Sequence, residues 1–283
     1  MNKLYPHNDD HNRFFEKAQI PYSRSKEEVW NDMVDRMQIR NESSKKTRKL
    51  IVYWAAAALV TLLIGLSAFM RFYSMTLHVP PGQHLSHTLP DGSKVDLNAG
   101  TKLNYYPYWW RFARITELDG EAYFNVEEGK PFTVKSLQGE TRVLGTRFNI
   151  YARNKEYRVH CIRGKVQVES GSGNKQILET NQAVKVSGRG EMEYLTRVKV
   201  QDAIAWTRNQ FVYTAEPLEK VFMELERQFD ITIELEPGIK GEYTGNFQRG
   251  NSPEKILRMI ARPFGLEVKQ INQTKYRITK DRD

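Results

Sequence analysis

Two pairs of residues in this chain have types and spacing that chemistry could use. His84 and His87 are three residues apart, as metal ligands can be, but no carboxylate or third histidine stands nearby. His160 and Cys161 are neighbours in a run that alternates like a strand, so their side chains point to opposite faces and cannot form a nucleophile and its base. We therefore interpret the two spaced histidines as loop residues and Cys161 as a buried thiol.

Motifs that would indicate an enzyme are absent from the sequence. It has no G-x-S-x-G, no phosphate-binding loop and no G-x-G-x-x-G, and its single cysteine excludes an intramolecular disulfide framework and a zinc ribbon. We expect no enzymatic activity, no catalytic residue, no cofactor and no metal. The formal charge of +9 raises the question of a nucleic-acid partner, and the answer depends on where the charge lies.

One segment without charge divides the chain. Residues 50–70 (LIVYWAAAALVTLLIGLSAFM) would form a helix about 31 Å long, enough to cross the roughly 30 Å hydrocarbon core of a bilayer. A buried helix of a soluble protein is the alternative, but such a helix usually keeps a polar stripe. The mean hydropathy of the whole chain, −0.63, excludes a multi-spanning protein. We predict a single-span membrane protein.

Basic residues around this segment predict its orientation. Those shortly before it are Arg36, Arg40, Lys45, Lys46, Arg48 and Lys49. After it comes Arg71, and then no lysine or arginine until Lys94. Because basic residues stay in the cytoplasm, we expect residues 1–49 there and residues 71–283 on the other side, with membrane lipid near the basic cluster. The two parts carry +3 (11 minus 8) and +6 (32 minus 26) without a basic stripe, so we expect no direct contact with nucleic acid.

The segment before the span contains one patterned stretch. Ser25 and Glu28 form a capping box, which predicts a helix start. Apolar residues then follow on one helical face, and we call them the α-helical stripe: Val29, Trp30, Met33, Val34 and Met37. A shorter stretch offers Phe14, Phe15 and Ala18. Two short amphipathic pieces bury little surface between themselves, so we predict that the stripe binds a cytoplasmic protein; a small self-packed bundle or a helix lying on the membrane is the alternative.

Residues 71–205 are predicted to form an all-β domain. Runs typical of strands are separated by Gly, Pro, Asn and Asp at spacings of about 8–12 residues. They are 95–97, 122–126, 132–134, 148–152, 157–162, 166–169 and 183–186. No helical period of useful length interrupts them, which indicates a sandwich, a roll or a solenoid.

A dense aromatic run lies within this region. Its members are Tyr105, Tyr106, Tyr108, Trp109, Trp110 and Phe112. They cannot all face one core from a strand, so we expect some of them to be exposed as a docking surface for protein or carbohydrate. The alternative is that about half lie in the core and the rest cover it.

Residues 206–283 are predicted to be an internal duplication. The helical runs 217–229 and 253–264 align at an offset of 35, which pairs Glu219 with Glu254, Lys220 with Lys255, Arg227 with Arg262, and Phe229 with Phe264. Pro217 and Pro253 are expected at the first helical position. Strand-like runs flank both helices, so we predict two β-α-β units packed as a small α+β domain.

Four motifs of the β region resemble those of FecR-type anti-sigma factors. They are LPDGSKVDLN at 89–98, LDGEAYFNV at 118–126, PFTV at 131–134 and VLGTRFNI at 143–150. The order of the parts also resembles that family in Bacteroidetes-type bacteria: a short cytoplasmic region, one span, a β domain and a small duplicated domain. The last domain is similar to the short N-terminal domains of secretins and TonB-dependent transporters. Asp96 departs from the pattern, since many relatives have an aromatic residue there, and we interpret it as a local change in packing.

The resemblance implies a transmembrane anti-sigma factor or signal transducer of the inner membrane, with residues 71–283 in the periplasm. In that family the signalling domain of an outer-membrane TonB-dependent transporter contacts the periplasmic part. The cytoplasmic segment, here the α-helical stripe, then holds and releases or activates an extracytoplasmic-function sigma factor. Some relatives are cut at a Gly-Thr bond, and Gly145 and Thr146 are the matching pair; a turn or bulge at Gly145 is the alternative. The alternative function is a membrane-anchored periplasmic protein that binds a glycan or another ligand through the aromatic run.

Overall fold

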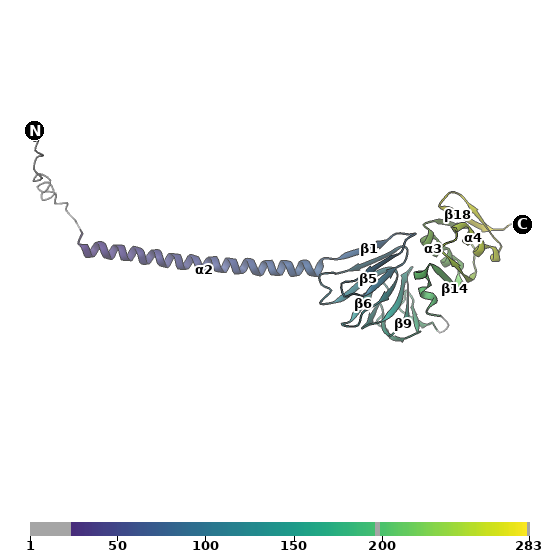
Figure 1. Cartoon of the computed structure of the whole chain (residues 1–283), viewed down its shortest axis with the longest axis horizontal. Helices are drawn as coiled ribbons and strands as arrows, with labels where there is room; N and C mark the ends of the chain where they lie inside the picture. Colours follow the sequence, from purple (N-terminus) through teal and green to yellow (C-terminus); the bar gives the residue numbers. More distant parts are fainter. Residues whose placement is uncertain (1–23, 196–198, 282–283) are drawn as a thin grey trace, which may run out of the picture. The chain divides into compact units, whose positions relative to one another are not determined.

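The computed structural model describes residues 24–195 and 199–281, and it divides the chain into two compact units that meet after Leu66. The first unit contributes most of one long helix. The second unit, from Ser67 onward, holds a β domain and a C-terminal α+β domain (Figure 1). The short stretch with Phe14, Phe15 and Ala18 lies outside the described residues.

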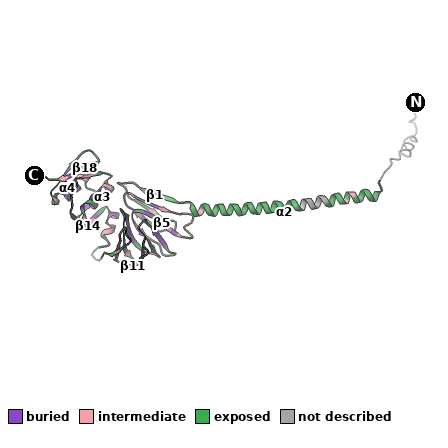
Figure 2. Ribbon diagram, turned by 180° about the vertical axis from the view of Figure 1, so that it is seen from behind, coloured by how far each residue is buried: buried purple, intermediate pink, exposed green. Residues whose placement is uncertain are grey.

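The long helix, α2, extends over Lys26–Phe72, 47 residues. It begins with the predicted capping box: the backbone N–H of Glu28 donates to the Ser25 hydroxyl over 3.2 Å, and the N–H of Ser25 donates to the Glu28 carboxylate over 2.9 Å. Among the described residues it is the one helix long and apolar enough to cross a membrane, over Lys46–Phe72. Figure 2 shows most of its described surface as exposed. The helix expected before the span and the span itself are therefore one continuous element.

The β domain contains thirteen strands among the described residues. Their bounds are β1 Met75–Val79, β2 Leu85–Thr88, β3 Lys94–Leu97, β4 Thr101–Tyr105, β5 Arg114–Asn125, β6 Phe132–Lys135, β7 Gly139–Val143, β8 Arg147–Arg153, β9 Glu156–Arg163, β10 Lys165–Ser170, β11 Lys175–Glu179, β12 Ala183–Val186 and β13 Met192–Tyr194. Neighbouring strands follow the order β11-β10-β7-β6-β5-β8-β9-β12-β13. The structure thus has the largely β domain that the sequence predicts.

The long strand β5 joins the two halves of this arrangement. Its first half pairs with β4 and β6, and its second half pairs with β3 and β8. Gly120 lies at the change between them with a φ of 132°, and a Cβ atom there would be 2.5 Å from the Thr101 hydroxyl oxygen. Only glycine fits such a conformation and such a close approach, so this residue lets one strand serve both halves.

The core of the β domain lies between the two halves. Alternating residues of β5 point inward, and Glu121 is the one buried residue of this strand that departs from the alternation. Phe124 and Phe148 stack at 5.1 Å between ring centroids, and Phe132 meets Phe124 edge to face at 5.9 Å. Cys161 is part of this core and has no solvent exposure.

The C-terminal domain consists of two β-α-β units and one further strand. Its elements are η1 Asp202–Arg208, β14 Gln210–Pro217, α3 Leu218–Phe229, β15 Thr232–Leu235, β16 Glu242–Gln248, α4 Pro253–Ala261, η2 Arg262–Phe264, β17 Leu266–Gln270 and β18 Lys275–Lys280. Strand β14 pairs with β16, and β18 lies between β15 and β17. The apolar faces of both helices pack against these sheets in one core.

One detail of this domain differs from the prediction. Pro253 is the first residue of α4, as predicted, but Pro217 is the last residue of β14 and has an extended conformation, with φ −52° and ψ 132°. It still pairs with Glu242 in the β14–β16 ladder. The strand therefore continues for one residue where the sequence pattern placed the helix.

Candidate functional site

The α-helical stripe is exposed on α2. Trp30 is 64% exposed, Met37 59% and Met33 48%, and Val34 is half-buried. An indole and two thioether side chains on one face of a helix form an adaptable apolar surface, of the kind that fits into a groove of a partner. The capping box fixes where the helix starts and therefore where this face lies along the chain.

The aromatic run divides between core and surface. Tyr105 and Trp110 are each 4% exposed and belong to the core of the β domain. The predicted docking surface therefore does not include these two rings. The remaining rings lie in a turn between β4 and β5, which we call the aromatic turn, residues 106–112. Tyr108 is 50% and Phe112 61% exposed, so part of the run is available for contact, as the sequence led us to expect.

The two spaced histidines have separate partners, and their interpretation as loop residues is wrong for His87, which lies in β2. His84 Nε2 is 2.9 Å from the Gln228 amide oxygen, and His87 Nε2 is 3.0 Å from the Tyr105 hydroxyl. Within residues 24–195 and 199–281, no group of three or more His, Cys, Asp and Glu side chains could hold a metal ion. His84 thus contributes to a contact between the two domains of the second unit.

His160 and Cys161 are both buried, with different consequences for each. Burial and the nearby Arg158 lower the pKa of His160 to about 3, so its imidazole is neutral. Burial raises the pKa of the Cys161 thiol to about 11, and its Sγ lies 3.4 Å from the Gly164 carbonyl oxygen. A thiol with a raised pKa is a poor nucleophile, and the predicted buried thiol is confirmed.

A group of buried polar side chains, which the sequence analysis did not identify, joins the β domain to α3. We call it the interdomain polar cluster: His84, Asn98, Glu121, Asn149, Glu224, Arg227 and Gln228. Gln228 has no solvent exposure, and its amide nitrogen donates to Asn98 and to Glu224 over 2.7 Å each. Its amide oxygen faces His84. One glutamine of α3 therefore connects to two separate segments of the β domain.

The β domain holds its own carboxylate at the centre of this cluster. Asn98 and Asn149 donate to the two oxygens of Glu121 over 2.8 and 3.0 Å. Asn149 also accepts a bond from the Trp206 indole N–H over 3.4 Å, and Trp206 belongs to η1. Buried polar groups are costly unless they are paired, so these bonds favour one relative position of the two domains.

Electrostatics distinguish the two carboxyl groups of the cluster. Burial and the charge of Glu224 raise the pKa of Glu121. Burial acts on Glu224 in the same direction, but Arg227 and Arg153 outweigh it and lower the pKa of Glu224. Arg227 binds Glu224 with two nitrogen atoms, at 3.1 and 2.7 Å. Glu224 is thus the ionised member of a charge pair, whereas Glu121 depends on neutral amide donors.

Charged contacts surround the cluster. Lys220 of α3 donates to Glu156 of β9 over 2.6 Å, and Arg158 pairs with Glu216 of β14 at 3.7 Å. Beside them, residues 210–216 of β14 line a cleft of about 800 Å³ between the two domains. These charge pairs connect β9 of the β domain with β14 and α3 of the C-terminal domain.

The Gly145-Thr146 pair lies just before β8. A Cβ atom on Gly145 would be 2.5 Å from Cγ and 2.9 Å from Cα of Glu128, so close packing explains the glycine. Thr146 is buried, and its hydroxyl donates to the Lys165 carbonyl over 2.9 Å. The structure thus gives a packing reason for Gly145, and cleavage after it stays a prediction.

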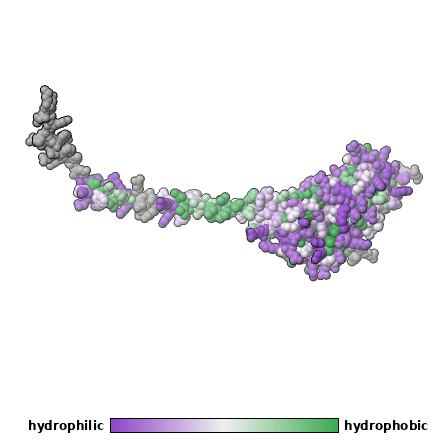
Figure 3. Space-filling view, viewed as in Figure 1, coloured by the Kyte–Doolittle hydropathy of each residue, from purple (hydrophilic) through white to green (hydrophobic). Residues whose placement is uncertain are grey.

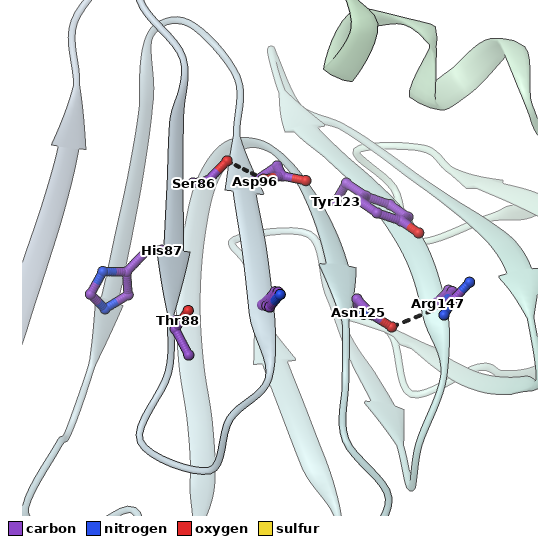
Figure 4. Close-up of a pocket in the computed structure, with 8 residues that line it drawn as sticks. Ser86, His87, Thr88, Asp96, Tyr123, Asn125 and Arg147 are labelled. Atoms are coloured by element: carbon purple, nitrogen blue, oxygen red, sulfur yellow. Dashed lines mark hydrogen bonds between the residues drawn. The ribbon is translucent and has the colours of Figure 1, made fainter.

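A shallow polar hollow lies on the outer face of β2, β3, β5 and β8 (Figure 4). Its volume is about 560 Å³, and its lining residues include Thr88, Lys94 and Tyr123. The Ser86 hydroxyl donates to Asp96, and Arg147 donates to Asn125 over 3.0 Å. Asp96 lies on this face between the buried Val95 and Leu97, so its carboxylate contacts a polar neighbour and stays out of the core.

Known protein families match the β domain and the C-terminal domain separately. The FecR protein family matches residues 75–167, and the FecR C-terminal family matches residues 210–278. A crystal structure of a candidate anti-sigma factor from Parabacteroides distasonis ATCC 8503 is similar, with 29% identity and a TM-score of 0.67 over 73% of this chain and 99% of that chain. A second crystal structure described in the same words has 28% identity and a TM-score of 0.67 over 74% and 99%. No curated protein matches the chain. The first match extends from β1 into β10 of the β domain, and the second covers most of the C-terminal domain. The chain therefore belongs to the FecR family as a FecR-type anti-sigma factor.

Proposed function

We propose that this protein is a single-pass inner-membrane signal transducer that relays the state of an outer-membrane TonB-dependent transporter to an extracytoplasmic-function sigma factor. Residues 1–49 lie in the cytoplasm, and the β domain and the C-terminal domain lie in the periplasm. The observation that carries this proposal is the exposed α-helical stripe, which lies on the same continuous helix as the apolar segment.

The helix supports the membrane anchoring. The 27 residues of Lys46–Phe72 extend about 40 Å at 1.5 Å per residue, which exceeds the roughly 30 Å of a hydrocarbon core. Figure 3 shows the hydrophobic part of α2 next to hydrophilic residues of the same helix. The basic residues concentrated before the segment support a cytoplasmic N-terminus.

The stripe supports a protein partner on the cytoplasmic side. Its exposed indole and thioether groups would be buried in a groove of the sigma factor, which gives the apolar gain that a helix-in-groove contact requires. A sigma factor held in this way would be kept at the membrane. Release or activation follows when the periplasmic part changes or is removed by proteolysis, and the Gly145-Thr146 bond is the proposed site of such a cut.

Free strand edges support docking of the transporter's signalling domain. Among the described residues, β14 and β16 pair only with each other, so each has an unpaired edge. An extended segment of a partner can add to such an edge by backbone hydrogen bonds. The C-terminal domain is joined to the β domain through the interdomain polar cluster. Binding of the transporter at β14 or β16 would therefore change the stability of the contact between these two domains.

Co-purification tests the role of the stripe. We expect the double change Trp30→Asp and Met33→Asp to abolish co-purification of an extracytoplasmic-function sigma factor from the same cells, because two charges would be buried in the apolar contact. The matched control is Asn31→Asp with Gln38→Asp, which adds the same charge at exposed positions on another face of α2. The control should bind as the unchanged protein does.

The outcomes separate the competing functions. Equal binding by the stripe variant and the control would overturn the assignment of the stripe. Unchanged transcription after deletion of the gene, together with sugar affinity of the periplasmic part, would favour the glycan-binding alternative. Mass spectrometry of the chain from cells, with and without inducer, tests the cleavage: only intact chain under both conditions would remove it.

A further inference from the structure

The aromatic turn is built so that one ring anchors it while others stay outside. The N–H of Trp109 donates to the Tyr106 carbonyl over 3.1 Å, and the N–H of Phe112 donates to the Trp109 carbonyl over 2.9 Å, so the segment makes two successive turns. Trp110 points inward and meets Phe132 edge to face at 5.7 Å. Trp109 and Phe112 pack on each other at 4.6 Å between ring centroids. The turn is therefore a fixed feature that presents apolar rings to its surroundings.

This turn contacts the last residues of α2. Tyr108 lies 5.9 Å from Phe69 and 5.1 Å from Tyr73, and these two rings are 5.4 Å apart. All of these residues belong to the second unit of the chain. Three rings from two distant segments thus form one group where the apolar helix ends. Each keeps a large exposed surface in spite of these contacts.

A cation lies among the neighbouring rings. The Arg71 guanidinium carbon is 5.6 Å from the centroid of Phe72, 5.9 Å from Tyr106 and 5.6 Å from Trp109. Arginine over aromatic faces gains cation–π attraction, and its planar group still presents N–H donors to an anion such as a phosphate. Trp and Tyr with a nearby basic residue are the composition of a membrane interface.

Further groups at this end of the β domain have the same character. Lys130 is exposed and donates to the carbonyl of Arg111, an exposed residue of the turn, over 3.1 Å, so a further cation lies beside the turn. Gly129, next to Lys130, donates to the carbonyl of Leu144, whose side chain is also exposed. Three carboxylates lie in the same region: Glu117 accepts a bond from the Tyr106 hydroxyl over 3.1 Å, and the exposed Glu127 and Glu128 precede Gly129 in the chain. The cations nearest the end of α2 are Arg71, among the rings, and Arg111, within the turn, and the exposed rings give the group its apolar character.

Chain geometry places this group at a defined depth. Three residue steps separate Phe72, the last residue of α2, from Met75, the first residue of β1, so the two are at most about 11 Å apart. The headgroup region is about 5–8 Å thick on each side of a bilayer. If α2 crosses the membrane, the rings that touch its last turn lie in or directly above this layer.

We propose that the aromatic turn, together with Phe69, Arg71 and Tyr73, is a lipid-binding surface that lies in the headgroup layer of the membrane. Its rings occupy the interface and its cations bind anionic headgroups. This inference rests on the proposed transmembrane anchoring. It goes beyond anchoring because it gives the β domain a second, non-covalent attachment to the bilayer.

Lipid explains the surface better than a protein partner does. The group is continuous with the apolar segment, and a protein bound there would have to compete with headgroups for the same space. Exposed aromatic rings with a few basic groups fit a fluid surface that adapts to them. A protein contact at this place is the competing result of the test.

The test uses the full chain in nanodiscs of phosphatidylethanolamine and phosphatidylglycerol. One introduced cysteine, Phe112→Cys, carries an environment-sensitive nitrobenzoxadiazole label, and Leu137→Cys is the matched control. Leu137 is 91% exposed and lies between β6 and β7, at the other end of β6 from the aromatic turn. Leu62→Cys, in the apolar part of α2, reports the span. The unchanged chain, whose only thiol is the buried Cys161, gives the background.

We expect the label at 112 to emit at shorter wavelength than the label at 137, with several-fold weaker quenching by aqueous iodide and strong quenching by headgroup-attached nitroxide lipids. Tyr108→Cys should behave as Phe112→Cys does. Equal iodide quenching at 112 and 137, while the label at 62 is quenched by nitroxides deep in the acyl chains, would overturn this inference and leave the anchoring intact. A label at 62 that aqueous iodide quenches freely would overturn both.

Discussion

The two repeats of the C-terminal domain share their inner face and differ in their outer face. At the offset of 35, Val221 corresponds to Ile256 and Leu225 to Ile260, and all four side chains are buried in one core. The same offset places Met259 of α4 where α3 has Glu224. Glu224 is buried in the interdomain polar cluster, whereas Met259 is exposed.

This difference shows how a duplicated unit acquires a binding role. Helix periodicity fixes the apolar face that both repeats need, because each helix must cover its strands. The opposite face is free to change, and in α3 it carries the polar side chains that bind the β domain. The first repeat therefore has an adaptor role, by which we mean that the outer face of α3 binds the β domain. The outer face of α4, in the second repeat, is exposed at Met259.

Truncation of the shared core should have the largest effect in both repeats. Leu225→Ala and Ile260→Ala each leave a cavity in the same apolar core, and we expect each to lower the free energy of unfolding of the C-terminal domain by about 2–5 kcal/mol. Hydrogen exchange of the α3 and α4 amides in the full chain measures this loss. An effect confined to the repeat that carries the change would mean that the two repeats do not share one core.

The outer positions should behave differently in the two repeats. Glu224→Ala removes the partner of Arg227 and one acceptor of Gln228, so we expect a cost of about 1–3 kcal/mol, because buried donors remain unpaired. Met259→Ala, at the equivalent position of α4, should change stability by no more than about 0.5 kcal/mol, since the site is exposed. Urea unfolding of both variants checks the contrast. Similar costs at 224 and 259 would contradict the adaptor role.

Acid should weaken the contact of the first repeat selectively. Burial lowers the pKa of His84 below its usual value of 6.5, and Arg249 lowers it further, although Gln228 and Glu224 act in the opposite direction. Because the folded state prefers the neutral imidazole, its contribution is complete above about pH 6.5 and is lost as the pH falls below that value.

The effect is measured as the ratio of the amide hydrogen-exchange rates in α3 to those in α4. The intrinsic pH dependence of amide exchange affects both helices alike and cancels in this ratio. We expect the ratio to rise between pH 7 and pH 5 in the unchanged chain. It should stay flat in His84→Gln, which keeps an N–H donor but cannot take up a proton. A ratio that rises equally in both proteins would assign the acid response to another group.

Periodicity predicted most elements of this structure, because it reflects local requirements. The capping box at Ser25 and Glu28, seven of the thirteen strands of the β domain and the two helices of the duplication follow from residue spacing within a short window. The other six strands, β1, β2, β4, β7, β11 and β13, were not among the predicted runs. The position of Pro217 was missed because extended pairing with Glu242 holds it in the strand, and that partner lies far along the chain.

The interdomain polar cluster could not be predicted from local patterns. Gln228 and Glu224 are four residues apart on one face of an amphipathic helix. Polar residues with this spacing are usually exposed to solvent, so the local pattern predicts a solvated face. Their burial depends on Asn98 and His84, which are more than a hundred residues away. Likewise, the inward direction of Trp110 in the aromatic run depends on its contact with Phe132 of β6. Contacts between segments that are distant in the chain therefore determine the burial of Glu224, Gln228 and Trp110.

The smallest difference between the repeats should appear at the paired lysines. Lys220 of α3 donates to Glu156 of the β domain over 2.6 Å, and Lys255, its equivalent in α4, is exposed. Lys220→Met should cost about 0.2–1 kcal/mol at low salt, since the ammonium group is only partly buried, and Lys255→Met should be neutral within about 0.5 kcal/mol. Urea unfolding at two salt concentrations measures both. The cost at Lys220 should shrink in high salt because screening weakens a partly exposed pair. A cost that does not depend on salt would show that the methylene chain of Lys220, packed between the domains, stabilises the contact, and that the charge does not.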